Sequence, residues 1–284
     1  MNSSIKKPNA WITGHTGFIG QELTKNLKQK FEIFRISRND ILESNKFFKK
    51  KIYINEIKRN DLKKFKNNFL FHLATLYNPN PKSIIDVKNI IESNLSFGLR
   101  VLNNIGHDYF SKILLTQSSF EFQDIEYAKL YIQTKAMFAN ELEQIIPKKI
   151  IKIYLYDTFG LSDKRNKLVK IWLKKLMLNQ PITIFSENTL INLSSGKFVS
   201  KILSKINSIK PGSYEIRSDV QMTLIELLNF FKEITNSKSK IIIKNNKPII
   251  IINKYDNLSK IFNINYTISD FKKDIIEILN NKNF

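Results

Sequence analysis

The pattern of apolar and polar positions predicts strands that alternate with helices along the first half of the chain. Helices are expected where apolar residues recur every three or four positions, as at Leu23 and Leu27, over 84–105 and over 127–144. Strands are expected at the short apolar runs 10–12, 31–37, 51–54, 68–73, 112–116 and 150–156. This alternation predicts an α/β fold with a doubly wound parallel sheet. Its ligand is expected at the carboxyl ends of the strands.

The pattern changes beyond about residue 158. An amphipathic helix is expected over 165–179, and Pro181 marks its end. Thr223-x-x-Glu226 is a capping box that begins a further helix. Isoleucine-rich strands at 241–243 and 249–252 and a helix near 269–279 complete this part. We therefore expect a first lobe over 1–158 and a smaller C-terminal α/β lobe over 159–284, with a brief return to the first lobe near 182–206.

A glycine-rich turn lies between the first strand and the first helix. The chain has eight glycines, and Gly14, Gly17 and Gly20 are three of them. Gly14 allows a sharp turn, Gly17 allows the backbone to approach a pyrophosphate, and Gly20 allows close packing of the helix. An ordinary tight turn would also explain three glycines, but their position between a strand and a helix favours a dinucleotide site.

Composition narrows the class of protein. The chain has no cysteine, which excludes disulfides and thiolate metal sites, and its histidines (His15, His72, His107) have no metal-ligand spacing. We therefore expect no structural metal. No apolar run approaches the roughly 20 residues of a membrane span, and residues 1–9 lack a secretory apolar core. A soluble cytoplasmic protein without membrane partners is expected.

The net charge of +21 is compatible with nucleic-acid binding. However, the lysines are spread along the chain among asparagine and isoleucine and form no basic arm. This distribution favours a general compositional bias with mild attraction for anionic ligands, so we expect no nucleic-acid partner.

Tyr131 and Lys135 are the strongest candidates for chemistry. Their four-residue spacing places them on one face of a helix, where the ammonium group is expected to lower the pKa of the phenol. Such a pair also occurs by chance, but this one follows the strand at 112–116, whose end carries Ser118 and Ser119. A serine hydroxyl there could hold a carbonyl oxygen on which the tyrosine acts.

Together, these motifs resemble the extended short-chain dehydrogenase/reductase family, also called the epimerase/dehydratase family. The resemblance includes the turn at 13–20, the segments 72–74, 156–160 and 256–260, and Asn94. It implies a Rossmann sheet, a homodimer built on the Asn94 and Tyr131 helices, and catalysis by Ser118, Tyr131 and Lys135. Ser118 is preferred to Ser119 by counting back from Phe122, where relatives often have tyrosine.

The resemblance also implies which residues bind ligands. Cofactor-binding residues are expected to be Gly14, Thr16, Gly17, Phe18, Ile19, Gly20, Ser37, Arg38, Leu73, Ala74, Thr75, Tyr131, Lys135 and Thr158. Substrate-binding residues are expected to be Tyr77, Ser119, Asp157, Arg165 and Lys167. Relatives usually carry an arginine and a Val-Asp-Asp type segment near residue 200, but this chain has Ile-Asn-Leu-Ser-Ser-Gly-Lys over 191–197. Arg165 and Lys167 are therefore the candidate diphosphate anchors.

Within the family, the short loop between Ser118 and Tyr131 and the segment 157–167 look most like CDP-paratose and CDP-abequose synthases. The implied function is NADPH-dependent reduction of a 4-keto group on a nucleotide-activated deoxysugar. A nucleotide-sugar 4-epimerase with tightly bound NAD(P) and a non-catalytic NADP-binding sensor are the alternatives. A dehydratase is disfavoured, because Phe120-Glu121 follows Ser119 in place of the family's Asp-Glu pair.

The end of the second strand bears on the choice of cofactor. An acidic residue there would bind the ribose 2′-hydroxyl of NAD, but residues 35–39 are Arg-Ile-Ser-Arg-Asn. Ser37 and Arg38 suit a 2′-phosphate, so NADP is favoured over NAD. A solvated arginine at a strand end is the alternative explanation.

Overall fold

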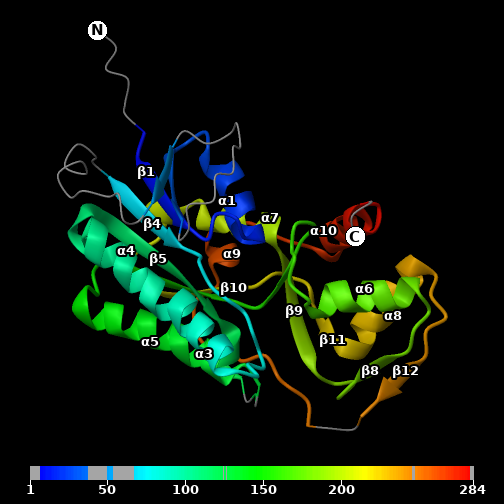
Figure 1. Ribbon diagram of the computed structural model, residues 1–284. Helices are drawn as coiled ribbons and strands as arrows, with labels where there is room; N and C mark the ends of the chain where they lie inside the picture. The colour runs from blue at the N-terminus through cyan, green and yellow to red at the C-terminus, as the bar shows by residue number, and fades with distance from the viewer. Residues whose placement is uncertain are drawn as a thin grey trace.

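The computed structural model describes residues 7–37, 50–53, 67–123, 125, 127–244 and 247–281. Its centre is a seven-stranded parallel sheet with the order β10-β6-β5-β4-β1-β2-β3 (Figure 1). The strands are β1 (Asn9–Thr13), β2 (Glu32–Ser37), β3 (Lys50–Tyr53), β4 (Asn68–His72), β5 (Phe110–Ser118), β6 (Ile150–Leu155) and β10 (Gly212–Ile216). The predicted α/β fold with a doubly wound parallel sheet is confirmed.

Helices cover both faces of this sheet (Figure 1). One face carries α1 (Phe18–Leu27) and α7 (Gly196–Leu203), and the other carries α3 (Ile84–Ile91), α4 (Phe97–Ile105) and α5 (Lys129–Ile145). The period-two alternation of a strand explains the two layers. In β1, Ala10 and Ile12 belong to the apolar cluster with α1, whereas Trp11 belongs to the cluster with α4 and α5.

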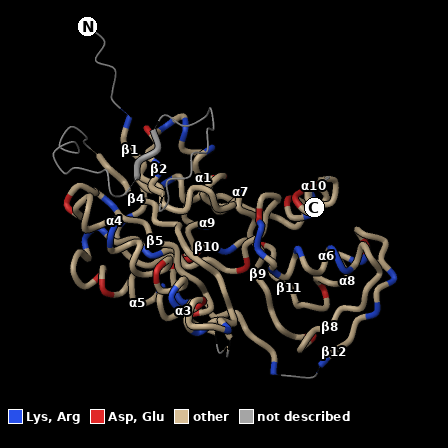
Figure 2. Tube along the Cα trace, viewed as in Figure 1, with Lys and Arg blue, Asp and Glu red and all other residues tan. Residues whose placement is uncertain are grey.

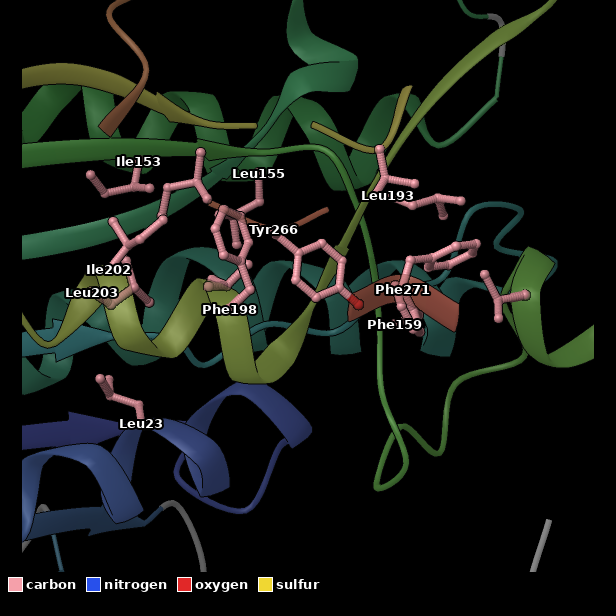
Figure 3. Packing of buried hydrophobic residues seen from close by; sticks show 14 of the residues in the cluster. Leu23, Ile153, Leu155, Phe159, Leu193, Phe198, Ile202, Leu203, Tyr266 and Phe271 are labelled. Carbon is pink, nitrogen blue, oxygen red and sulfur yellow. The ribbon is translucent and has the colours of Figure 1, made fainter. Parts of the chain in front are cut away.

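The larger cluster continues into the second part of the chain, where three helices pack around a three-stranded sheet (Figures 1 and 3). The helices are α6 (Leu168–Met177), α8 (Leu224–Thr235) and α10 (Ile268–Leu279), and the strands are β7 (Asp157–Phe159), β9 (Leu190–Ser195) and β11 (Gln221–Thr223). A separate two-stranded sheet pairs β8 (Ile182–Ile184) with β12 (Ile241–Ile243). A shared core therefore joins the two parts.

Short helical turns complete the described elements. They are η2 (Glu92–Ser96), which is π-helical, η3 (His107–Tyr109), η4 (Ser119–Phe122), η5 (Ile206–Ser208) and α9 (Leu258–Ile261). The helix predicted over 84–105 is one continuous helical segment, formed by α3, η2 and α4. The predicted capping box is confirmed, because Thr223 and Glu226 each accept a hydrogen bond from the other's backbone amide at the start of α8.

The predicted strand at 249–252 is wrong. The Ile249 carbonyl accepts a hydrogen bond from the Leu190 amide, but 249–252 forms no sheet ladder. The strand β8 is already paired with β12, and Ile250 and Ile252 are exposed. The single backbone hydrogen bond to Leu190 does not form a ladder, and β propensity alone does not make a strand.

The chain returns to the central sheet within the expected segment 182–206, at α7, and the return continues beyond it. Helix α7 packs on α1, and the Asn26 amide donates a 2.7 Å hydrogen bond to the Ser200 hydroxyl. After α7 the chain adds β10 to the edge of the sheet beside β6. In Figure 3, Phe198, Ile202 and Leu203 of α7 lie among Leu23 of α1 and Ile153 and Leu155 of β6.

Lysine and arginine are scattered over many elements of the described chain and do not gather on one helix or strand (Figure 2). None of the helices in the part that the structure describes is long and apolar enough to cross a membrane.

Candidate active site

The glycine turn between β1 and α1 has two glycines that the protein's own packing requires. Gly14 has φ +67°, and a Cβ atom there would lie 2.6 Å from the Ala74 nitrogen. A Cβ atom on Gly20 would lie 2.2 Å from the Gly14 carbonyl oxygen. At Gly17 the nearest atom would be 3.2 Å away, and the φ of −71° suits any residue. Close packing in the protein therefore explains why positions 14 and 20 are glycine. At Gly17 the missing side chain leaves the backbone accessible to a ligand.

The end of β4 is held against this turn by Thr13. The Thr13 hydroxyl lies 3.0 Å from His72 Nδ1 and accepts a hydrogen bond of 3.2 Å from the Ala74 amide. Residues 73–75 therefore lie beside the glycine turn at the carboxyl edge of the sheet.

Asn94 connects the segment after β4 to α5, the helix that carries Tyr131. It lies in the π-helical turn η2 and is buried. Its Oδ1 accepts hydrogen bonds from the Leu76 amide (2.7 Å) and the Thr75 hydroxyl (3.1 Å). Its Nδ2 donates to the Leu76 carbonyl (3.2 Å) and to Thr134 Oγ1 (3.3 Å). A π turn often marks a functional site, and here it carries the side chain that links these two segments.

A cavity of about 560 Å³ joins the glycine turn to the Tyr131 helix. It brings together sixteen of the residues that the sequence predicted: Gly14, Thr16, Gly17, Phe18, Ile19, Gly20, Ser37, Leu73, Ala74, Thr75, Ser118, Tyr131, Lys135, Thr158, Arg165 and Lys167. The predicted cofactor ligand Arg38 lies outside the described residues. The strand order explains the convergence, since β1, β4, β5 and β6 are neighbours and end at one edge.

Three of the expected substrate residues do not line this cavity. Ser119 is buried, with 2% of its surface exposed, so Ser118 is the serine at the cavity. Asp157 lines a smaller cavity of about 90 Å³, which it shares with Lys167. The Tyr77 ring contacts two residues that line the larger cavity. Its ring lies edge-on to Tyr131 at 5.1 Å between centroids, and Lys167 Nζ lies 4.8 Å from its centroid.

The expected lowering of the Tyr131 pKa is wrong for the protein by itself. Burial raises the pKa of Tyr131 to about 12, although Arg165 and a hydrogen bond with Thr75 act in the opposite direction. Burial also lowers the pKa of Lys135 to about 8, and Lys135 Nζ lies 5.8 Å from the centroid of the Tyr131 ring. Loss of hydration therefore outweighs the attraction between the phenolate and the Arg165 guanidinium.

The two candidate diphosphate anchors differ in their surroundings. Arg165 makes an ion pair with Asp163 at 2.7 Å, donates to Thr158, and lies 4.4 Å from the centroid of the Phe18 ring. It is thus held beside the glycine turn. The Lys167 ammonium makes no hydrogen bond or ion pair with a described residue, and burial and Arg165 lower its pKa to about 8.

The divergent segment 191–197 supplies no cation to the cavity. Strand β9 lies in the core between β7 and β11, and the Ser194 hydroxyl is buried without a hydrogen-bond partner among the described residues. Ser195 caps α7, and Lys197 pairs with Asp274 and Glu277 of α10.

Sequence reasoning missed several residues that line the same cavity. They are His15, Arg35, Ile36, Ser93, Phe97, Thr116, Gln117, Leu155, Tyr156, Ser162, Asp163 and Lys164. Arg35 had a usable signal, because it lies two positions before Ser37 and strand residues two apart face the same side. Tyr156 follows directly after β6, at the sheet edge where ligands are expected.

A model of the NAD dependent epimerase/dehydratase family matches residues 10–189. The chain belongs to this family. Its fold is similar to that of UDP-N-acetylglucosamine 4-epimerase from Methanobrevibacter ruminantium M1, with 15% identity, a TM-score of 0.72, and 96% of this chain and 97% of that chain covered. No curated protein matches the sequence.

Two further epimerase/dehydratase folds are similar over nearly the whole chain. UDP-glucuronic acid 4-epimerase from Bacillus cereus has 14% identity and a TM-score of 0.74, covering 95% of this chain and 98% of that chain. UDP-glucose 4-epimerase from Thermus thermophilus has 13% identity and a TM-score of 0.72, covering 96% and 99%. At such identities the likeness establishes the fold of this family member.

The buried His72 ring predicts acid sensitivity. Burial and Lys135 lower the pKa of His72 to about 3, so the ring is neutral in the folded protein at neutral pH. The unfolded chain binds a proton at about pH 6.5, and stability is therefore lost as the pH falls below that value. From about pH 7 to about pH 5, wild type should lose about 2 kcal/mol more unfolding free energy than His72→Gln. Urea unfolding measures this difference, and identical pH dependence would contradict it.

Proposed function

We propose that this protein transfers hydride between a nicotinamide cofactor and C4 of the sugar in a nucleotide sugar. The observation that carries the proposal is that Ser118, Tyr131 and Lys135 line one cavity with the glycine turn. The family membership supports a nicotinamide cofactor. Three similar solved structures are UDP-sugar 4-epimerases, which supports a nucleotide sugar as substrate.

The cavity fits a dinucleotide cofactor. Its volume of about 560 Å³ extends from the glycine turn to Tyr131, and the first turn of α1 contains no acidic residue that would repel a phosphate. The turn at 14–20 would hold the pyrophosphate, with residues 73–75, Lys135 and Thr158 along the rest of the cofactor. When bound, the nicotinamide ring supplies or accepts the hydride.

The chain's own residues would transfer the proton and stabilise the charge that the transfer creates. The Tyr131 hydroxyl gives its proton to the C4 oxygen as the carbonyl is reduced, and takes it back in the reverse direction. Ser118 donates a hydrogen bond to the same oxygen. Lys135 and Arg165 stabilise the phenolate that Tyr131 becomes, so the charge that leaves the sugar oxygen stays in the cavity.

Of the two reactions that use this proton transfer, we propose 4-epimerisation first, because three similar solved structures are 4-epimerases. The second candidate is 4-ketoreduction by NADPH. It is favoured by the short loop between Ser118 and Tyr131, which resembles CDP-paratose and CDP-abequose synthases. We also propose a cytoplasmic location, with which the absence of cysteine is compatible.

We expect purified protein to convert at least one member of a panel of nucleotide sugars and their 4-keto derivatives. An epimerase interconverts two 4-epimers without net loss of reduced cofactor, whereas a reductase consumes NADPH in equal amounts. Tyr131→Phe should lower turnover by about 100-fold or more, since general acid–base catalysis contributes that much. Its cofactor affinity should stay near that of wild type. Full activity of Tyr131→Phe would refute the proposed role, and cofactor binding without turnover of any sugar would favour the sensor hypothesis.

We further propose that NADP is preferred over NAD. The cavity-facing end of β2 carries Arg35 and Ser37 and no carboxylate that could bind a free ribose diol. NADPH should therefore bind more tightly than NADH in a fluorescence titration, and Arg38→Glu should reverse the order. Lys30→Glu makes the same charge change in an exposed turn and should leave the order unchanged. Equal affinity for the two cofactors in wild type would overturn this preference.

A homodimer built on the helices that carry Asn94 and Tyr131 is also proposed. Large apolar side chains are exposed on this helical layer, with 47% exposure at Leu99 and 55% at Met137. Light scattering should give a dimer, and Leu99→Glu with Met137→Glu should give a monomer, because charges are costly in an apolar contact. Ile276→Glu, on the exposed side of α10, should stay dimeric. A wild-type monomer at high concentration contradicts the proposal.

A further inference from the structure

Glu215 is a fully buried carboxylate in β10, the edge strand of the central sheet. Its Oε1 accepts hydrogen bonds from the backbone amides of Lys254 (2.6 Å) and Tyr255 (2.9 Å). Its Oε2 accepts a hydrogen bond of 3.0 Å from the Tyr156 hydroxyl and lies 2.8 Å from Arg217 Nε in an ion pair. Each oxygen of this carboxylate therefore faces two donors.

These four donors require a carboxylate at position 215. Both oxygens of a carboxylate accept, whereas the side-chain amide of glutamine has one acceptor and one NH₂ group that only donates. In either orientation of such an amide, the NH₂ group would face donors, either the two backbone amides or Tyr156 and Arg217. A buried donor without an acceptor is costly, so glutamine at position 215 cannot hold both sides.

Tyr156 connects Glu215 to the large cavity. It follows β6 directly and lines the same cavity as Ser118 and Tyr131. Its hydroxyl lies 3.0 Å from Glu215 Oε2 and 2.9 Å from the Ile252 carbonyl oxygen. A phenol has a single proton, which is donated here to these two acceptors and not to a ligand. Tyr156 therefore serves the cavity as a wall whose position depends on groups outside it.

The segment that Glu215 binds offers a second, less direct route to the cavity. The Tyr255 ring lies edge-on to the Phe122 ring, with 5.5 Å between centroids. Phe122 ends the turn η4, which begins directly after Ser118. This route runs through a backbone amide and a ring contact, whereas the route through Tyr156 is one hydrogen bond. The shorter route is therefore favoured.

We infer that Glu215 is a positioning residue, which holds Tyr156 in the wall of the cavity where the nicotinamide cofactor binds. This inference rests on the proposed function for the nature of the ligand. A hydrogen bond to a charged acceptor is roughly twice as strong as one between neutral groups, so Glu215 fixes the phenol more firmly than the Ile252 carbonyl does. Burial and Glu215 both raise the pKa of Tyr156, so the phenol stays neutral and keeps its proton for this bond.

The first measurement is the ¹³C resonance of Tyr156 in ligand-free protein labelled at the tyrosine Cζ. Tyr156→Phe identifies this resonance by removing it. Glu215→Gln should shift the resonance, because the phenol loses its charged acceptor. Asn257→Ala is the matched control, since Asn257 is buried and bonds the Arg217 backbone but makes no hydrogen bond with Tyr156. It should leave the resonance unchanged even if the melting temperature falls.

The second measurement is the affinity for NADPH in a fluorescence titration. Glu215→Gln and Tyr156→Phe should each weaken binding about tenfold, the value of one hydrogen bond to a charged group. If Glu215 acts through Tyr156, the double variant should also lose about tenfold and not about 100-fold. Asn257→Ala should stay within about twofold of wild type. If Glu215→Gln fails to fold, the loss in Tyr156→Phe alone decides.

The inference is overturned if Glu215→Gln leaves the Tyr156 resonance in place, if Asn257→Ala shifts it equally, or if the losses of affinity in the double variant add. Wild-type affinity in Tyr156→Phe would also overturn it.

Binding of cofactor by the wild type separates this inference from the proposed function. If wild type binds neither NADPH nor NAD, the proposed function fails, and the resonance of Tyr156 alone decides whether Glu215 positions it. If wild type binds a cofactor and neither Glu215→Gln nor Tyr156→Phe weakens binding, the role of Glu215 fails and the proposed function stands.

Discussion

The contact between the ends of β1 and β4 is the constraint on which the cavity depends. Gly14 and Ala74 approach so closely that no Cβ atom fits between them, and the Thr13 hydroxyl bonds both His72 Nδ1 and the Ala74 amide. Because the two strands are parallel neighbours, this contact holds the glycine turn and residues 73–75 at one edge of the sheet. Neighbouring β5 and β6 add Ser118 and Tyr156 to the same edge.

Buried polar side chains connect the edge of the sheet to the helices that cover it. Asn94 uses its hydrogen-bonding capacity on the Thr75–Leu76 segment and on Thr134, one turn after Tyr131. A buried amide with all its groups bonded fixes its neighbours, since breaking any one bond leaves a polar group without a partner away from water. The position of Tyr131 relative to the end of β4 therefore depends on a side chain from a third element.

Burial and positive charge compete in this cavity. Both Lys135 and Lys167 have a pKa lowered to about 8 by burial, and Arg165 lies nearby in an ion pair with Asp163. An anionic ligand would favour the charged form of both lysines and raise their pKa values again. The protein by itself thus carries a desolvation cost that a phosphate-bearing ligand would offset, in agreement with the proposed function.

The sequence by itself determined the order of strands and helices, the glycine turn and the residues at the carboxyl edge. Local signals suffice for these features: apolar periodicity sets the elements, and parallel strands bring Gly14 and Ser118 to one edge, with Tyr131 on the helix that follows Ser118. Only the tertiary structure decided the π turn at Asn94, the return of β10 to the sheet and the loss of a strand at 249–252. It also decided that the pKa of Tyr131 rises, whereas the four-residue spacing to Lys135 had predicted a fall. Spacing along a helix shows which groups are near each other, but strand pairing and desolvation depend on neighbours that are distant in sequence.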